Sequence, residues 1–144
     1  MEDTTEVRAA IDSLISAILS KDIEAIQARY LHEDRLFIFL EGWYGKIEGF
    51  DREPNAAAWS SLLNQVEFSV IELTDDAHAG RIGDMGWVGA STRSVLVEPG
   101  ADEPTEIHQR ATWIMEKHSG EWRIVHEHVS FPTDAPYGAE ELAG

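Results

Sequence analysis

The spacing of apolar residues changes once along this chain, and that change constrains the fold more than any other feature. In the first third they recur every three or four residues, as on one side of a helix, whereas in the second half they alternate with polar residues, as in strands. Helices followed by strands indicate an α+β domain rather than repeated strand–helix–strand units. The 144 residues suffice for one domain with one core.

Three helices are expected before the main strands. An apolar stripe predicts the first over residues 4–19, with Asp3 and Glu6 spaced as a capping pair. The same spacing resumes over residues 23–31, and a third helix begins around residues 51–54, where a proline in the first turn is tolerated. Strands are expected over residues 35–40, 66–70, 81–97, 107–116 and 122–131.

Charge and composition exclude several classes of protein. The chain has 11 basic and 27 acidic residues, a formal net charge of -16, which repels nucleic acid and anionic lipid. It has no cysteine, which excludes disulfides, thiolate nucleophiles and zinc–thiolate sites. It lacks a membrane-length apolar run and a secretory leader, so we expect a cytoplasmic protein. No phosphate-binding loop, dinucleotide fingerprint or metal motif is present, so we expect neither cofactor nor metal.

The last two strands define two candidate faces through their hairpin, in which Gly120 suits a tight turn. A three-residue loop pairs Lys117 with Glu121 and divides the side chains between two faces. One face holds Arg110, Thr112, Ile114, Trp122, Ile124, His126 and His128; the other holds Ala111, Trp113, Met115, Val125, Glu127 and Val129. The second face is apolar with one carboxylate, as in a small-molecule cavity, so we assign it to the concave side. A loop one residue longer would swap the partners.

Glu127 is the candidate catalytic residue on this assignment. A carboxylate removed from water among Trp113, Met115 and Val129 would have a raised pKa and could act as a general acid or base. The alternative is a surface or interface glutamate paired with Arg110 or Arg123.

Other candidate pocket residues each have an alternative structural role. Trp43 and Tyr44 stand in a glycine-flanked loop that could rim a pocket, while Trp59 could line it or belong to the core. Arg110 could steady developing negative charge or form a salt bridge. His126 and His128, two apart on one strand, could ligate a metal or shuttle protons in the pocket, or serve hydrogen bonding at an interface.

The order of elements and the closing run from Gly120 to Ser130 resemble the SnoaL-like branch of the nuclear transport factor 2-like superfamily over residues 5–132. The closing run also resembles the association domain of calcium/calmodulin-dependent protein kinase II. The resemblance implies a curved antiparallel sheet around the first helices, as in the cystatin-like fold, with a cone-shaped hydrophobic pocket and a homodimer packed through the sheet. It also implies one domain over residues 1–132 and leaves an acidic tail over residues 133–144, which we expect to be flexible.

Members of this superfamily include isomerases, dehydratases, cyclases, hydrolases, transport factors and oligomerisation domains, so the resemblance gives fold more than function. Two hypotheses follow. The first is a cofactor-free isomerase, cyclase, dehydratase or hydrolase that moves a proton on a small hydrophobic substrate through Glu127. The second is a non-catalytic ligand-binding or oligomerisation module.

Overall fold

The structure is a computed structural model that describes residues 2–40 and 46–133. The helices are α1 (Thr5–Leu19), α2 (Ile23–Gln27) and α3 (Arg52–Gln65). The strands are β1 (Phe37–Phe39), β2 (Ile47–Glu48), β3 (Glu67–Leu73), β4 (His78–Ile82), β5 (Met85–Val97), β6 (Thr105–His118) and β7 (Glu121–Ser130). The α+β class expected from the sequence is confirmed, and β2 is a strand that the sequence did not predict.

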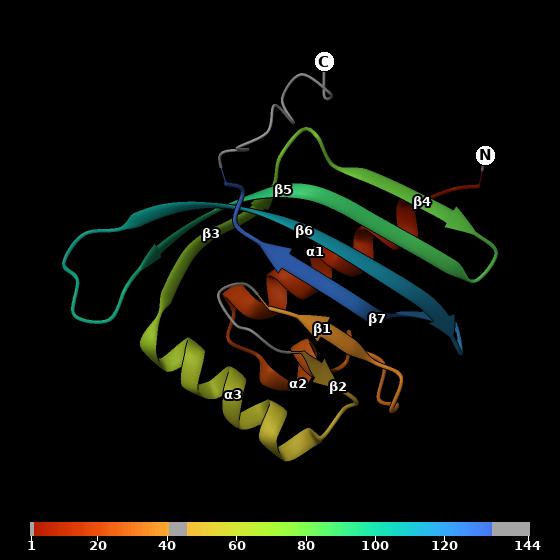
Figure 1. The fold of residues 1–144 in the computed structure, drawn as a ribbon, viewed down its shortest axis with the longest axis horizontal. Coiled ribbons are helices and arrows are strands. Elements are labelled where there is room, and N and C mark those ends of the chain that lie inside the picture. Colours follow the sequence, from red (N-terminus) through yellow and green to blue (C-terminus); the bar gives the residue numbers. More distant parts are fainter. Residues whose placement is uncertain (1, 41–45, 134–144) are drawn as a thin grey trace.

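The seven strands form one sheet, which arches over α1 (Figure 1). Its order is β2-β1-β7-β6-β5-β3, and β4 also pairs with β5. The sheet is mixed rather than purely antiparallel, because β1 runs parallel to β7. None of the helices in the described ranges is both long and apolar enough to cross a membrane.

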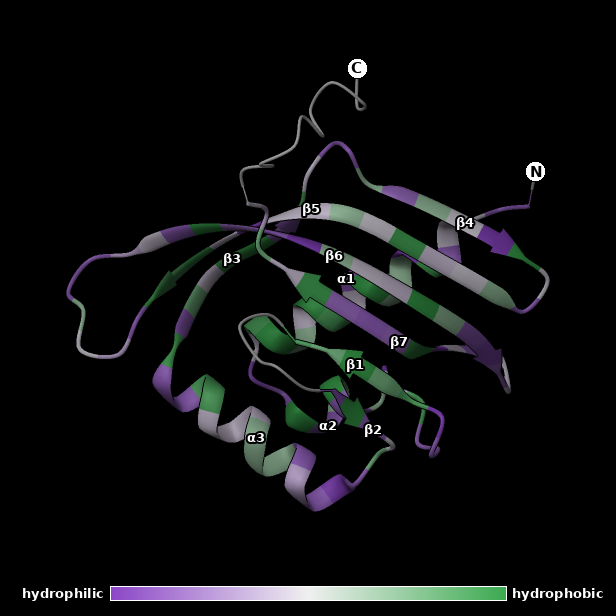
Figure 2. Cartoon of the chain, viewed as in Figure 1, coloured by the Kyte–Doolittle hydropathy of each residue, from purple (hydrophilic) through white to green (hydrophobic). Residues whose placement is uncertain are grey.

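The core lies between α1 and the inner face of the sheet. Val7, Ile11 and Leu14 on α1 are 0, 0 and 2% exposed, which follows from their spacing along one helix face. Buried and more exposed residues alternate along much of β5 and β6, so each of these strands turns one side toward this core. Figure 2 shows hydrophobic (green) stretches on α1 and on these strands. The capping pair does not form as expected: Asp3 accepts from the Thr5 backbone at 2.9 Å, while Glu6 accepts from the Trp122 indole at 3.1 Å.

The second helix is shorter than the sequence predicted, because the chain leaves it to join β7. The Asp22 carboxylate caps α2 by accepting from the Ala25 backbone at 3.1 Å. After α2, the Leu31 amide donates to the Ile124 carbonyl at 2.9 Å, and the Ile124 amide donates to the Arg29 carbonyl at 2.7 Å. These bonds dock the segment after α2 on the sheet and place Tyr30 opposite Ile124.

The prediction of one long strand over residues 81–97 is wrong at its start, where the structure has the β4–β5 hairpin. Gly83 adopts φ +59° and the chain reverses there, so β4 pairs antiparallel with β5. Asp84 lies in this turn, where its carbonyl accepts from the Lys117 amide at 2.8 Å.

The β6–β7 hairpin differs from the expected one in two ways that offset each other. Ser119 (φ 50°) and Gly120 (φ 83°) form a two-residue turn, so His118, not Lys117, pairs with Glu121. Further along, Ile114 pairs with His126 and Met115 with Ile124. Residue 125 therefore has no partner on β6, and β7 has one residue more than β6 at this bulge.

The shorter turn moves residues 122–124 to the face opposite the one expected. Trp122 and Ile124 are 4% and 1% exposed on the inner face, and their assignment to the other face is therefore wrong. The extra residue restores the original alternation beyond it, so Glu127 and Trp113 are paired and both buried.

Candidate functional site

Glu127 is a buried carboxylate held by side chains from two other parts of the fold. It lies on β7 and is 7% exposed. The hydroxyl of Tyr30, which follows α2, donates to its Oε1 at 2.7 Å. The indole Nε1–H of Trp113, directly opposite on β6, donates to the same oxygen at 2.8 Å. Ninety-seven residues separate Tyr30 from Glu127 in the sequence, and the docking of the chain after α2 brings them together.

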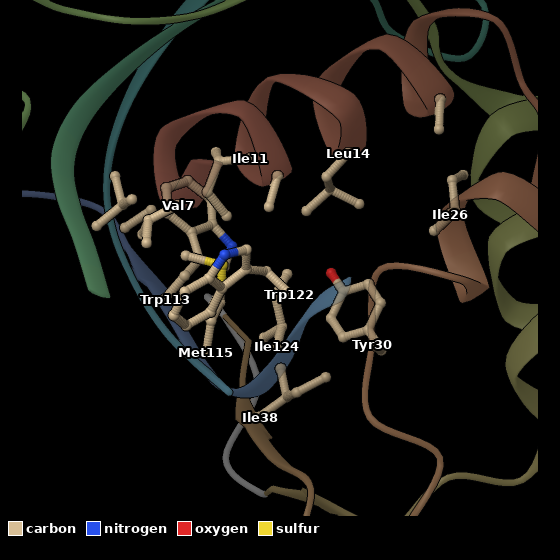
Figure 3. Close-up of a cluster of buried hydrophobic side chains, with 14 of the residues drawn as sticks. Val7, Ile11, Leu14, Ile26, Tyr30, Ile38, Trp113, Met115, Trp122 and Ile124 are labelled. Atoms are coloured by element: carbon tan, nitrogen blue, oxygen red, sulfur yellow. The ribbon is translucent and has the colours of Figure 1, made fainter. Parts of the chain in front are cut away.

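The surroundings of this group are apolar. Figure 3 shows Tyr30 and Trp113 reaching into a cluster that also contains Ile38, Met115 and Ile124. Burial raises the pKa of Glu127 above 4.5, while the hydrogen bonds from Tyr30 and Trp113 partly oppose that rise. Burial and the nearby Glu127 raise the pKa of the Tyr30 hydroxyl well above 10.0, so Tyr30 keeps its proton and acts as a donor.

The two donors leave one carboxyl oxygen of Glu127 available. Both bonds go to Oε1, and no described side chain hydrogen-bonds Oε2. Within the described ranges, every fully enclosed side-chain nitrogen or oxygen has a hydrogen-bond partner. Oε2 is therefore not fully enclosed and still touches accessible space. An available oxygen on a carboxyl with a raised pKa can give or take a proton.

Of the other residues singled out from the sequence, Trp113 is the one that hydrogen-bonds Glu127 within the described ranges. Trp59 lies on α3, half-buried and packed against the core. Trp43 and Tyr44 lie outside the described residues. Glu127 pairs with no arginine in the described part of the chain, since Arg123 binds Glu121 at 2.9 Å.

Arg110, His126 and His128 lie on the outer face of the sheet, away from Glu127. Arg110 and His128 are exposed. The His126 ring stacks on Phe37 with centroids 4.0 Å apart, and its Nδ1 lies 3.0 Å from the Phe37 carbonyl oxygen. Because side chains alternate between faces, these three cannot share a site with Trp113 and Glu127.

Tyr30 is the functional candidate that sequence reasoning missed. Its side chain is 4% exposed, as expected for an aromatic residue of the core. Its hydroxyl, however, needs a buried partner, which a core assignment alone does not supply. No local spacing relates Tyr30 to Glu127, so only the docking of the chain after α2 could have shown the contact.

Two surface pockets lie elsewhere on the molecule. One, of about 780 Å³, is lined by α2, the start of α3 and the β6–β7 turn. The other, of about 540 Å³, is lined by β2 and the start of α3. Neither includes Glu127. Among the described residues, no cluster of three or more potential metal ligands is found.

Comparison with protein families and solved structures identifies the fold. The family model of the SnoaL-like domain matches residues 7–134. A ketosteroid isomerase-like protein from Erwinia carotovora atroseptica is 18% identical, with a TM-score of 0.72 and coverage of 92% of this chain and 98% of that one. A nuclear transport factor 2-like superfamily protein from Salmonella enterica is 16% identical, with a TM-score of 0.77 and 94% coverage of each chain.

A third similar structure is named for the calcium/calmodulin-dependent protein kinase II association domain and comes from Xanthomonas campestris. It is 16% identical, with a TM-score of 0.67 and coverage of 94% of this chain and 91% of that one. At these identities the likenesses show the fold alone. No curated protein matches the chain. Because the family model spans most of its length, the chain belongs to the SnoaL-like domain family.

Proposed function

We propose that this SnoaL-like domain binds a small hydrophobic molecule on the inner side of its sheet and moves a proton on it through Glu127. The observation that carries the proposal is the pair of hydrogen bonds that fix Glu127 Oε1, at 2.7 and 2.8 Å, while Oε2 keeps access. A fixed carboxyl with one available oxygen suits an isomerase, in which one group takes a proton from one carbon and returns it to another. It also suits a dehydratase, in which the group takes a proton from carbon and delivers it to the departing hydroxyl as the C–O bond breaks.

The environment of Glu127 supports this role. Burial raises the pKa of Glu127, so its carboxylate is a stronger base than one in water. A stronger base removes a proton from a carbon atom of the substrate more readily. Tyr30, with a raised pKa, can donate a hydrogen bond but does not itself ionise near neutral pH. The ketosteroid isomerase-like name of one similar structure agrees with a proton-transfer reaction, although that name belongs to the other protein.

The experiment follows hydrogen exchange at carbon, because exchange reports proton removal without requiring the natural substrate. The protein is incubated in D₂O with apolar bicyclic ketones such as tetralone and indanone, and deuterium uptake next to the carbonyl is measured by mass spectrometry. Glu127→Gln keeps the shape of the side chain and removes the titrating group. Glu72→Gln, at an exposed outer-face carboxylate, is the matched control.

We expect catalysed exchange in the natural protein and in Glu72→Gln, and loss of at least about 100-fold of it in Glu127→Gln, as is typical when a general base is removed. Exchange that is the same in Glu127→Gln as in the natural protein, or absent in both across the ketone panel, would reject Glu127 as the proton-transferring group.

A second candidate function, assembly through the sheet, is favoured by an aromatic cluster on the outer face. Phe37 and Phe39 are 37% and 40% exposed, and their rings contact those of His126 and His128. Exposed apolar rings gathered on one face are typical of a contact surface. We propose a homodimer packed through this face. It is compatible with a site on the inner face, because the two faces do not share side chains.

Sedimentation velocity tests the dimer with two charge substitutions. Phe39→Glu places a carboxylate in the aromatic cluster, whereas Leu62→Glu places one on α3, where Leu62 is 43% exposed. We expect the natural protein and Leu62→Glu to sediment as dimers and Phe39→Glu as a monomer. A monomeric natural protein would reject the assembly function and leave the proposal for Glu127 untouched.

A further inference from the structure

Thr92 and Ser94 are two buried polar side chains that the architecture does not explain. They are 7% and 4% exposed on β5. Both lie on the inner face, because they stand an even number of residues from the core residue Val88 on the same strand. They pair with Leu73 and Ile71 of β3. They therefore face the same side of the sheet as Glu127.

Neither hydroxyl has a hydrogen bond with the described residues, although buried polar groups normally have one. Since every fully enclosed polar side-chain atom in the described ranges is paired, both hydroxyls must touch accessible space. The same reasoning applies to Glu127 Oε2. The inner face thus carries unpaired oxygens at two places along the sheet, with small side chains at Ala90 and Ala111 between them.

Strand register gives the separation of the two places. Glu127 pairs with Trp113, and Gln109, four residues before Trp113 on β6, pairs with Thr92 on β5. Four residues along a strand span about 13 Å and two strand spacings span about 10 Å, so the Cα atoms of Glu127 and Thr92 lie about 16 Å apart at most. Curvature toward the inner face shortens the path between the side chains.

We propose that Thr92 and Ser94 form a second binding point that hydrogen-bonds an uncharged polar group at the far end of the ligand whose reacting end lies at Glu127. The inference rests on the proposed function and names the class of molecule: an elongated, mostly apolar compound with a hydroxyl or carbonyl at its distal end. The group is uncharged because the register neighbours Leu73, Ile71 and Ile107 offer no countercharge to a buried ion.

The probes are linear alcohols that differ only in the distal group. Diols with a hydroxyl at each end of a chain of eight to twelve carbons are compared with the corresponding alcohols that carry one hydroxyl. Binding is followed by two-dimensional ¹H–¹⁵N NMR, in which the Trp113 indole reports the Glu127 end and the Thr92 amide reports the distal end. The Trp113 indole is assigned with Trp113→Phe.

We expect at least one diol to bind about 2- to 10-fold more tightly than its matched alcohol, the factor for one hydrogen bond. Thr92→Val combined with Ser94→Ala should abolish this preference, whereas Thr92→Ser, which keeps the hydroxyl, should preserve it. Thr112→Val, on the exposed outer face of β6, is the control and should leave it unchanged.

Stability separates a binding role from a structural one. Thr92→Val replaces an unpaired hydroxyl with a methyl group of similar size, so its melting temperature should equal or exceed that of the natural protein. A lower melting temperature for Thr92→Val, equal affinity for diols and alcohols, or no saturable binding of any diol would each overturn the proposal. A diol preference that survives in a protein without hydrogen exchange on ketones would retain the second binding point and reject only the role of Glu127.

Discussion

Replacing Tyr30 with phenylalanine removes a single hydrogen bond, and the consequence can be calculated from the structure. The Tyr30 hydroxyl donates to Glu127 Oε1 at 2.7 Å inside the protein. A hydrogen bond to a charged group contributes about 1.5–3 kcal/mol, and one between neutral groups about 0.5–1.5 kcal/mol. Tyr30 therefore stabilises ionised Glu127 more than protonated Glu127, by about 1.4 kcal/mol. That difference corresponds to about one pKa unit.

Two results follow for Tyr30→Phe. The pKa of Glu127, already raised by burial, should rise by about one further unit because a bond that lowers it is gone. The loss of stability should be about 1 kcal/mol at pH values where Glu127 is protonated in both proteins. It should grow to about 2.4 kcal/mol once Glu127 is ionised in both.

The sign of this pH dependence comes from proton linkage. Because the pKa of folded Glu127 lies above its unfolded value, its favourable contribution is complete below about pH 4.5 and is lost as the pH rises through the folded pKa. A higher folded pKa in Tyr30→Phe extends that loss to higher pH. The difference between the two proteins is therefore constant while Glu127 is protonated in both, and it increases as the pH rises through their two folded pKa values.

The assay is urea unfolding followed by tryptophan fluorescence from pH 4.5 to 9, combined with NMR titration of the Trp113 indole. That indole donates to Glu127 Oε1 at 2.8 Å, so its shift reports the charge of Glu127. Other carboxylates titrate equally in both proteins and cancel from the difference. A stability difference that is constant with pH, together with an unchanged indole midpoint, would refute the assigned contact.

Two further pairs of substitutions test the packing. A Cβ at Gly80 would lie 2.1 Å from the Trp87 ring, so Gly80→Ala should lower the free energy of unfolding, measured in urea, by about 1–3 kcal/mol. Gly89→Ala is the control. Among the described residues other than its two chain neighbours, no atom would lie nearer to its Cβ than 3.9 Å, so it should change the free energy of unfolding by less than about 0.5 kcal/mol. Ile124 is 1% exposed and Ile82 is 70% exposed. Ile124→Ala should therefore lower the free energy of unfolding by about 2–5 kcal/mol, and Ile82→Ala by less than about 0.5 kcal/mol. Equal effects within either pair would contradict the packing.

The sequence predicted the parts of the fold that depend on local periodicity. The helix at Thr5–Leu19 and the long strands β6 and β7 have strong repeating patterns, and all three are present. The length of the second helix was overestimated, because Tyr30 and Leu31 continue the helical spacing. In the structure, Tyr30 pairs with Ile124 of β7, and the Leu31 amide donates to the Ile124 carbonyl. Long-range pairing of this kind leaves no local pattern, which is also why the parallel β1–β7 contact was not expected.

The candidate site was predicted less completely than the fold. Glu127 and Trp113 were placed on one face correctly, but only because the shorter turn and the extra residue at position 125 offset each other. A one-residue change in register moves side chains to the other face of a strand, as happened to Trp122 and Ile124. Tyr30, Thr92 and Ser94 entered the site only through tertiary structure.

The pKa of Glu127 in the natural protein tests the central claim most directly. The side-chain carboxyl carbon is labelled with ¹³C, its signal is assigned with Glu127→Gln, and its shift is followed against pH by NMR. A midpoint above 4.5 is the predicted result, because burial outweighs the hydrogen bonds from Tyr30 and Trp113. A midpoint at or below 4.5 would show a solvated or fully compensated carboxylate and would contradict the assignment of Glu127 as the proton-transferring group.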